Sequence, residues 1–273
     1  MVAESLTETS YAFDAHARNY DALVEPNTLL QNMRAALWHE VTQRVPSPAR
    51  LLDLGCGTGI DAVYFAQRGY HVTALDVSRE MVIQTRQRVS TARVNVRIEN
   101  IGALDLEKLG DEKFDAIYSD LGPLNCVSDL EIVSKQCAAH LQPNGYLIFS
   151  VMARVCPWEI FYYSLRGDFK QATRRFPRQI IPVNLEDGVV WTRYYSPREF
   201  FKSFANEFQL ATYRSLNLFL PPPYLNRWYQ RAGILMKPLG WLEKNLSAFP
   251  VLRDMGDHFL IVLERKSGTH ANR

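Results

Sequence analysis

The sequence predicts an α/β protein with a doubly wound, mostly parallel sheet. Apolar runs of strand length alternate with helical patterns between residues 50 and 152, and "LLDLGCGTGI" places three glycines directly after the first run. The chain has 273 residues, of which 47% are hydrophobic and 22% are charged, so it can bury a full core. Repeated strand–helix–strand units imply right-handed crossovers, which put helices on both faces of one sheet.

Five apolar runs are predicted to form buried parallel strands, because each is nearly continuous rather than alternating. They are Arg50–Gly55, His71–Asp76, Asn95–Asn100, Phe114–Asp120 and Tyr146–Met152. Between them, one helix ends at Gly69, one begins after the N-cap Ser78 and one begins at Ser128. Ahead of the first strand, residues 28–41 have a helical pattern, and the prolines at positions 46 and 48 end that helix.

The two halves of the chain differ in composition. Residues 151–273 contain 18 Lys and Arg against 10 Asp and Glu, whereas residues 1–150 contain 13 against 19. The second half also holds 21 of the 32 aromatic residues, which indicates a nucleotide-binding first half and a substrate-handling second half. Residues 181–195 are predicted to form a hairpin that turns at 186–188, and Ser196 and Pro197 are predicted to begin a helix.

Composition also argues against several classes of protein. Four isolated cysteines, with no histidine at ligand spacing, predict neither a disulfide framework nor a metal site; they are Cys56, Cys126, Cys137 and Cys156. The N-terminus is polar and no apolar run is long enough to span a membrane, so we expect a soluble, cytoplasmic protein. The basic residues are mixed with acids, which does not favour a nucleic-acid partner.

The glycine-rich stretch joins the first predicted strand to the first helix. Gly55, Gly57 and Gly59 let the chain turn sharply, so a nucleotide cofactor can lie on the backbone amides at the helix N-terminus. Asp76 ends the next strand, where a carboxylate can accept hydrogen bonds from both hydroxyls of a ribose. The alternatives are a plain turn at the glycines and a helix-capping role for Asp76.

Spacing separates two cofactor families that use such a loop. The dinucleotide pattern is G-x-G-x-x-G, whereas here Ile60 occupies the sixth place. Together, "LLDLGCGTG", "LDVSREMV", "FDAIYSD", "HLQPNGYLIF" and "YAFDAHARNYD" resemble the class I S-adenosylmethionine-dependent methyltransferases over roughly residues 11–152. The resemblance implies a Rossmann-like sheet closed by a terminal antiparallel strand pair, 208–217 and 257–266, with an aromatic-rich cap insertion. It also implies S-adenosyl-L-methionine as cofactor and S-adenosyl-L-homocysteine as product.

The same resemblance assigns residues to the cofactor. The methionine portion would lie along Gly55, Cys56, Gly57, Asp120 and Leu121, and its amino group would be anchored by Asp53. The ribose would be bound by Asp76, and adenine would be flanked by Val77 and Met81. Tyr11 and Tyr20 would close over the cofactor. Many members place an acidic residue after the third strand, where this chain has Gly102. Adenine recognition is therefore expected from the backbone of Gly102 and Ala103, and from Asp105 only if that loop is longer.

Two residues are candidates for catalysis. His16 lies in "YAFDAHARNYD", a segment that resembles the lid of many members of this family. It could take a proton from a hydroxyl or carbon acid, or it could simply pack there. Asn125 follows the fourth strand and offers a donor and an acceptor to a substrate, or it could cap a turn. Holding the acceptor in line with the methyl group would itself supply most of the catalysis.

The acceptor is expected to be a small, hydrophobic or aromatic molecule. The loop "SDLGPLNC" lacks the N-P-P-Y or D-P-P-Y signature of amino methylation, and helix 156–176 carries an aromatic stripe that could roof a pocket. The alternatives are methylation of RNA or protein, and a non-enzymatic protein that binds S-adenosylmethionine or a dinucleotide. Residues 228–249, with basic residues among aromatic ones, could form a second flap that touches an anionic membrane, or they could pack inward.

These features divide the chain into four expected parts. Residues 1–48 form N-terminal lid helices, 49–152 the cofactor-binding core, 153–250 substrate cap elements plus a core strand, and 251–273 the last core strand and a tail. Neither the oligomeric state nor the methylated atom follows from the sequence.

Overall fold

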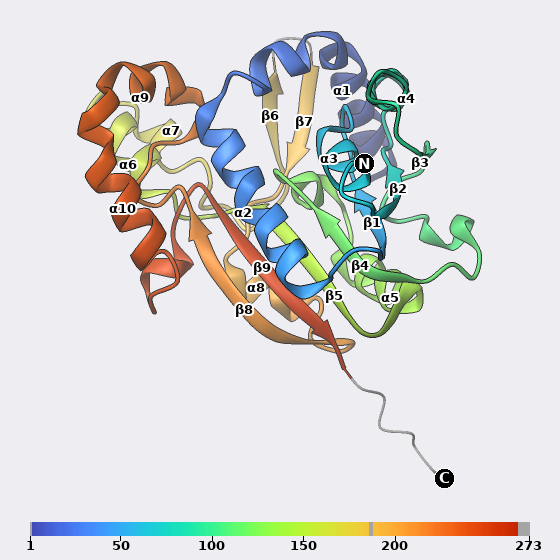
Figure 1. Ribbon diagram of the computed structural model, residues 1–273. Coiled ribbons are helices and arrows are strands. Elements are labelled where there is room, and N and C mark those ends of the chain that lie inside the picture. Colours follow the sequence, from blue (N-terminus) through green and yellow to red (C-terminus); the bar gives the residue numbers. More distant parts are fainter. Residues whose placement is uncertain (1, 186–187, 267–273) are drawn as a thin grey trace.

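A computed structural model describes residues 2–185 and 188–266 of the chain, with side chains from Glu8 onward (Figure 1). Within these residues a seven-stranded sheet runs through the centre of the molecule, in the order β3-β2-β1-β4-β5-β9-β8. Its strands are β1 (Arg50–Leu54), β2 (His71–Leu75), β3 (Val96–Glu99), β4 (Phe114–Ser119), β5 (Leu141–Met152), β8 (Phe208–Leu216) and β9 (His258–Arg265).

The sheet confirms the predicted doubly wound, Rossmann-like architecture. Strands β1 to β5 pair in parallel, whereas β9 runs antiparallel to both β5 and β8. The terminal antiparallel pair is therefore confirmed as well. The strand order reverses between β1 and β4, and in open α/β sheets a ligand crevice forms at the carboxyl ends of the strands at such a point.

Ten α-helices occur among the described residues, and most begin and end at residues that favour these positions. They are α1 (Val2–Val24), α2 (Thr28–Arg44), α3 (Ile60–Ala66), α4 (Arg79–Ala92), α5 (Leu130–His140), α6 (Pro157–Ser164), α7 (Phe169–Ala172), α8 (Pro197–Lys202), α9 (Asn226–Ala232) and α10 (Lys237–Leu246). Ser78 accepts a hydrogen bond from the backbone of Met81, and Ser196 from that of Glu199, so both predicted N-caps are confirmed.

The structure moves several predicted boundaries, and α3 ends at Ala66 rather than at Gly69. The N-cap of α5 is Asp129 rather than Ser128, because the carboxylate of Asp129 accepts hydrogen bonds from the amides of Glu131 and Ile132. Strand β5 begins at Leu141 rather than Tyr146, since Leu141 already pairs with Phe114 of β4.

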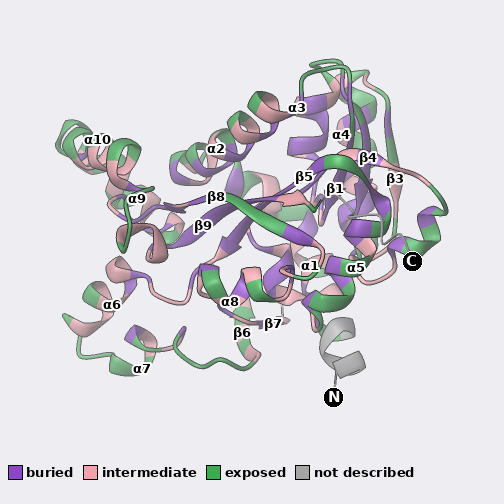
Figure 2. Ribbon diagram, turned by 90° about the horizontal axis from the view of Figure 1, so that it is seen from below, coloured by how far each residue is buried: buried purple, intermediate pink, exposed green. Residues whose placement is uncertain are grey.

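Two apolar cores lie on the two faces of the sheet. On one face, rings from α8 and from β5, β8 and β9 stack closely, with Phe200 and Phe204 only 5.0 Å apart between centroids. On the other face, α2 and α3 bury Leu37, Val41 and Phe65 against the sheet. Figure 2 shows the central strands buried, whereas α10 is exposed or half-buried at the edge of the molecule.

Helix α1 extends over the carboxyl ends of the strands and is held by polar contacts to α4. Asp14 accepts a hydrogen bond from the hydroxyl of Ser78 over 2.5 Å, and Asp21 pairs with Arg88 over 2.7 Å. A separate antiparallel pair, β6 (Ile181–Leu185) and β7 (Gly188–Thr192), packs against the other side of α1, which confirms the predicted hairpin strands. Two residues of its predicted turn, Glu186 and Asp187, lie outside the described residues.

Candidate functional site

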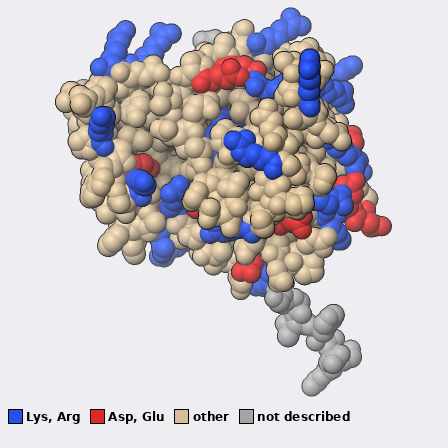
Figure 3. Space-filling model, viewed as in Figure 1, with Lys and Arg blue, Asp and Glu red and all other residues tan. Residues whose placement is uncertain are grey.

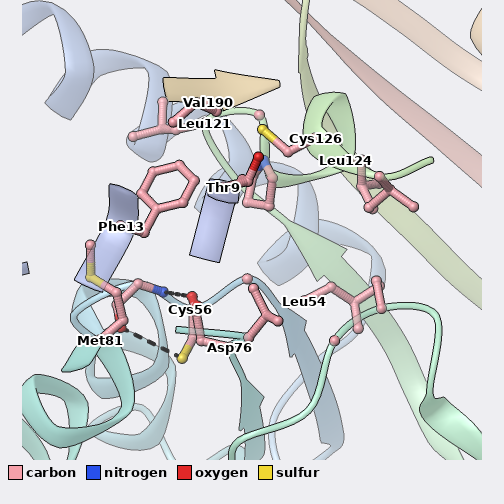
Figure 4. Close-up of a pocket in the computed structure, with 18 of the residues that line it drawn as sticks. Thr9, Phe13, Leu54, Cys56, Asp76, Met81, Leu121, Leu124, Cys126 and Val190 are labelled. Carbon is pink, nitrogen blue, oxygen red and sulfur yellow. Dashed lines mark hydrogen bonds between the residues drawn. The ribbon is translucent and has the colours of Figure 1, made fainter. Parts of the chain in front are cut away.

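A cavity of about 340 Å³ lies at the carboxyl ends of β1 and β4, where the strand order reverses. This is within the range of small-molecule sites. Figure 4 shows Asp76, Cys56 and Met81 on one side of the cavity and Val190, Cys126 and Leu124 across from them. The first group follows β1 and β2, and the second comes from the loop after β4 and from the β6–β7 hairpin.

The three glycines of the loop after β1 serve different purposes. All have positive φ, at 78°, 55° and 82° for Gly55, Gly57 and Gly59. A Cβ on Gly55 would lie 2.4 Å from Pro123, and one on Gly59 would lie 2.7 Å from Thr85, so these two allow the loop to pack against its neighbours. A Cβ on Gly57 would meet only Tyr20, at 4.0 Å. Gly57 therefore presents bare backbone to the cavity beneath α1.

Asp76 holds this loop in place and also lines the cavity. One carboxylate oxygen accepts a hydrogen bond from the Gly57 amide and the other from the Ser78 amide, each over 2.8 Å. Burial raises the pKa of Asp76 to about 6. The helix-capping alternative does not describe this residue, because the side chain of Ser78 caps α4. Asp76 is the acidic residue in the cavity that faces both the glycine loop and the start of α4.

A buried cluster of charged residues lines another part of the cavity, and it consists of Arg34, Asp61 and Asp120. Arg34 of α2 makes an ion pair with Asp61 of α3, and both side chains are at least 94% buried. The indole of Trp38 also donates to Asp61, over 2.7 Å. Burial lowers the pKa of Arg34, but the charges of Asp61 and Asp120 outweigh burial and hold it above its usual value. Arg34 therefore stays positively charged in the cavity wall.

Two polar atoms of this cluster lack a partner among the described residues. They are Nε of Arg34 and Oδ2 of Asp120, both fully buried. Burial and the nearby charge of Asp61 raise the pKa of Asp120 to about 7. Unpartnered buried polar groups are costly, and a ligand that carries both a carboxylate and an ammonium group would satisfy them.

Sequence reasoning missed Arg34 and Asp61. A signal for Arg34 was present, because it lies in α2 between Met33 and Leu37, both fully buried. A charged residue on the apolar face of a helix needs a buried partner. Nothing in the sequence identified Asp61 as that partner.

A further wall of the cavity is formed by residues that come after β2 and β3 in the sequence. Val77, Met81, Ile101, Gly102, Ala103, Leu104 and Asp105 line it. Gly102 lies between Val77 and Asp105, since a Cβ there would be 3.9 Å from each. The structure thus brings Asp105 to the cavity together with Gly102 and Ala103. This wall is mostly apolar.

The structure brings most of the residues predicted to bind the cofactor to this one cavity, but not all of them. Those that line the cavity are Gly55, Cys56, Gly57, Asp76, Val77, Met81, Gly102, Ala103, Asp120, Leu121 and Tyr20. Asp53 and Tyr11 do not. Asp53 is 1% exposed beneath the loop, where the hydroxyl of Tyr118 donates to it over 3.0 Å. Tyr11 is 68% exposed on the outer side of α1, while Thr9 and Phe13 of the same helix line the cavity.

Neither candidate for catalysis lines the cavity. Asn125 is fully buried: its amide group donates to the carbonyls of Met152 and Arg193, and its oxygen accepts from the Met152 amide. It ties the end of β5 to the residue after β7. His16 does not line the cavity; its ring packs edge-on against Tyr20, with 6.1 Å between centroids.

The remaining wall is largely apolar. It consists of Leu124, Cys126, Val127, Met152, Val183, Leu185, Val190, Thr192 and Tyr194. Burial raises the pKa of Cys126 to about 12, and that of Tyr194 also rises chiefly through burial. Both groups are therefore neutral at physiological pH. No histidine lines the cavity among the described residues.

The β6–β7 hairpin, rather than the expected aromatic helix or flap, covers this apolar wall. Neither the stripe Trp158, Phe161, Tyr162 and Leu165 nor any residue of 223–251 lines the cavity. The hairpin is held to α1 because the Trp191 amide donates to Thr9 over 3.1 Å and its indole donates to Glu8 over 2.6 Å. Gly188 also lies against Ala12, where a Cβ would come within 2.8 Å.

Comparisons with known proteins agree with this geometry. Residues 51–145 match the family described as "Methyltransferase domain". The chain is 30% identical over 136 residues to a putative methyltransferase, YqeM, of Bacillus subtilis, covering 48% of this chain and 53% of that protein. It is 34% identical over 111 residues to a ubiquinone biosynthesis O-methyltransferase of Xanthomonas axonopodis, covering 40% and 45%. The chain thus spans about half the length of the relatives it matches.

Solved structures share the fold over most of the chain. One is 1,6-didemethyltoxoflavin-N1-methyltransferase from Burkholderia thailandensis, solved with 1,6-didemethyltoxoflavin and S-adenosylhomocysteine bound. Its TM-score is 0.59 and its identity 18%, and the match covers 98% of this chain and 91% of that one. Among the described residues, no helix is long and apolar enough to cross a membrane.

Proposed function

We propose, from the premise that residues 51–145 form a methyltransferase domain of the S-adenosylmethionine-dependent class, that this chain methylates a small, hydrophobic or aromatic molecule. The observation that carries the proposal is one continuous cavity with two kinds of wall. Its polar part contains Asp76, Arg34 and Asp120, and its apolar part lies beneath β6 and β7. Such a cavity suits a polar cofactor and an apolar acceptor placed end to end.

The polar walls fit S-adenosylmethionine group by group. The carboxylate of Asp76 would accept hydrogen bonds from the ribose hydroxyls, and Val77 and Met81 would lie along adenine. The unpartnered atoms of Arg34 and Asp120 would bind the carboxylate and the ammonium of the methionine portion. When bound, this cofactor supplies a methyl group already activated by a sulfonium.

The protein's own contribution to the reaction is to position the acceptor and to exclude water. The hairpin and Phe13 enclose the apolar part, so an acceptor there would be held against the loop after β4. The neutral Cys126 and Tyr194 offer no charged base in this part of the cavity, so its contribution is to position the acceptor. The ubiquinone biosynthesis O-methyltransferase and the 1,6-didemethyltoxoflavin-N1-methyltransferase named above support a small-molecule acceptor.

Calorimetry with S-adenosylhomocysteine and with NADH tests the cofactor assignment. Binding of the first and not the second supports the proposal, and the reverse result would replace it with a dinucleotide-dependent function. Incubation with cell extract and S-adenosylmethionine carrying a labelled methyl group, followed by mass spectrometry, then tests the acceptor. Label in a small apolar product supports the acceptor class, whereas label in RNA or protein would contradict it.

Affinity for S-adenosylhomocysteine is expected to increase with pH. Burial raises the pKa of Asp76 to about 6. Between the ordinary pKa of an aspartate and pH 6, the folded protein therefore binds a proton that the unfolded chain has lost. The stability of the folded protein falls as pH rises through this window. A ligand whose hydroxyl groups donate hydrogen bonds to this carboxylate favours its ionised form. Binding should be roughly tenfold tighter at pH 7 than at pH 5, with Asp120 adding a second step near 7.

Calorimetry at pH 5, 6, 7 and 8 measures this dependence, and Asp76→Asn is the matched variant. It should lose the step near pH 6 and retain the one near 7. An affinity that does not change across the range would exclude both carboxylates from contact with the ligand.

If the apolar part of the cavity binds the acceptor, a larger side chain in that part should reduce methyl transfer. Val183 of β6 lines the cavity, whereas the next residue, Asn184, is exposed on the other face of the strand. Val183→Trp should reduce methyl transfer at least tenfold while affinity for S-adenosylhomocysteine stays within about threefold, because the added ring occupies acceptor space only. Asn184→Trp adds the same ring outside the cavity and should leave transfer unchanged. Equal losses in both variants would contradict the assignment.

A further inference from the structure

The segment that contains α9 and α10 exposes large apolar side chains. Neither helix contains a buried residue. Ile234, Leu235 and Val251 are 72–73% exposed, and Trp241 and Phe249 are 63% and 61% exposed. We call the exposed side chains of this segment the α9–α10 surface: Arg227, Trp228, Arg231, Ile234, Leu235, Lys237, Trp241, Lys244, Phe249 and Val251. Contiguous exposed apolar side chains of this size usually mark a contact surface.

All charged residues of the α9–α10 surface are basic. The one acidic residue of the sequence between 223 and 251 is Glu243, and it points into the protein. Its carboxylate accepts hydrogen bonds from the amides of Phe219, over 2.8 Å, and Leu220, over 3.4 Å. Figure 3 shows several Lys and Arg side chains among mostly uncharged atoms on the side of the molecule that carries α9 and α10.

Apolar and basic side chains share one face of these helices. Ile234, Lys237, Trp241 and Lys244 follow one another at intervals of three or four residues, which places them in one row along the helix surface. Arg227 and Arg231 follow the same spacing within α9, which ends at Ala232. The basic residues are therefore interleaved with the apolar ones rather than set on the opposite face.

From this arrangement we propose that the α9–α10 surface binds the interface of an anionic lipid bilayer. Lys and Arg can bury their aliphatic stems beside apolar side chains while their charges reach lipid headgroups, and Trp suits a boundary between apolar and polar layers. A protein partner is less suited to the pattern, since lysine is depleted from the centres of protein interfaces. A second copy would place like charges against one another.

The surface is separate from the cavity, because none of its residues lines that site. The proposal therefore goes beyond methyl transfer and can be tested without it. Contact would be peripheral: α9 and α10 would lie in the plane of the interface with their interleaved face in the headgroup region. An enzyme held there would meet apolar acceptors dissolved in the bilayer.

Vesicle co-sedimentation of the full chain tests the proposal. The probes are vesicles of phosphatidylcholine alone and vesicles in which about a third of the lipid is phosphatidylserine, at low and at physiological salt. We expect binding to the anionic vesicles only, weakened by salt. Each basic residue near the surface contributes roughly fivefold to affinity, so Lys237→Gln with Lys244→Gln should weaken binding about 25-fold. Ile234→Ser with Leu235→Ser should weaken it at least tenfold.

Matched controls lie on other helices. Lys135→Gln with Lys202→Gln removes two exposed lysines from α5 and α8, and Ile132→Ser removes an exposed isoleucine from α5. These variants should bind as the parent does, and S-adenosylhomocysteine affinity verifies that every variant is folded. Protein that stays in the supernatant with both vesicle types at low salt overturns the proposal. So does a dimer in sedimentation velocity that Ile234→Ser with Leu235→Ser converts to monomer.

Discussion

Arg34→Met is expected to lower the free energy of unfolding by about 3–5 kcal/mol, which is the scale for removing one partner of a buried ion pair. Asp61 would keep only the indole of Trp38 as a donor, and its carboxylate is 6% exposed. The remaining negative charge would thus lie in a low-dielectric environment without compensation. Urea denaturation followed by circular dichroism measures the change.

Two further variants separate loss of the ion pair from loss of packing. Arg34→Met combined with Asp61→Leu removes both charges and should recover more than about 1 kcal/mol of the loss. Lys108→Met removes one partner of the exposed pair with Asp105, where the side chains are 57% and 45% exposed, and should change stability by less than about 0.5 kcal/mol. A loss under about 1 kcal/mol for Arg34→Met would show that the pair is not essential to the fold.

Asp76→Ala is expected to weaken S-adenosylhomocysteine binding by about 1.5–3 kcal/mol, the cost of leaving charge-assisted hydrogen bonds unmade. The substitution removes the proposed acceptor for the ribose hydroxyls and also the acceptor of the Gly57 and Ser78 amides, which holds the glycine loop in place. Isothermal titration calorimetry measures the affinity, and a thermal unfolding curve shows how much of the effect comes from the loop.

Asp105→Ala is the appropriate comparison, because Asp105 also lines the cavity but its carboxylate is 45% exposed and paired with Lys108. Its affinity for S-adenosylhomocysteine should stay within about threefold of the parent. If the two variants bind equally well, Asp76 is not the ribose-binding residue and the site must be reassigned.

Local sequence was sufficient where one short stretch makes the feature by itself. Gly55, Gly57 and Gly59 were recognisable because only glycine readily adopts three positive φ values so close together. Asp76 was recognisable because a carboxylate at the end of a buried strand has a fixed position relative to the loop of the neighbouring strand. The N-caps Ser78 and Ser196 likewise depend on residues only three positions apart.

Other parts of the site depend on residues that are distant in the sequence. Arg34 and Asp61 are 27 positions apart, and Asn125 bonds to Arg193, 68 positions away. The sequence suggested a substrate role for Asn125 because an amide in that loop is free until the end of β7 packs against it. The same packing gives its side chain three hydrogen bonds within the protein and leaves it outside the cavity lining.

By itself the sequence determined the alternation of strands and helices, the glycine loop and the carboxylate beside it, because hydrophobic periodicity and backbone stereochemistry act over a few residues. Only the tertiary structure decided which element covers the cavity. Several segments are aromatic or apolar enough to do so, but only the β6–β7 hairpin contacts α1 through the Trp191–Thr9 hydrogen bond and the close approach of Gly188 to Ala12. Burial against a partner far along the chain depends on shape and on satisfied polar groups, and neither property is carried by a local pattern.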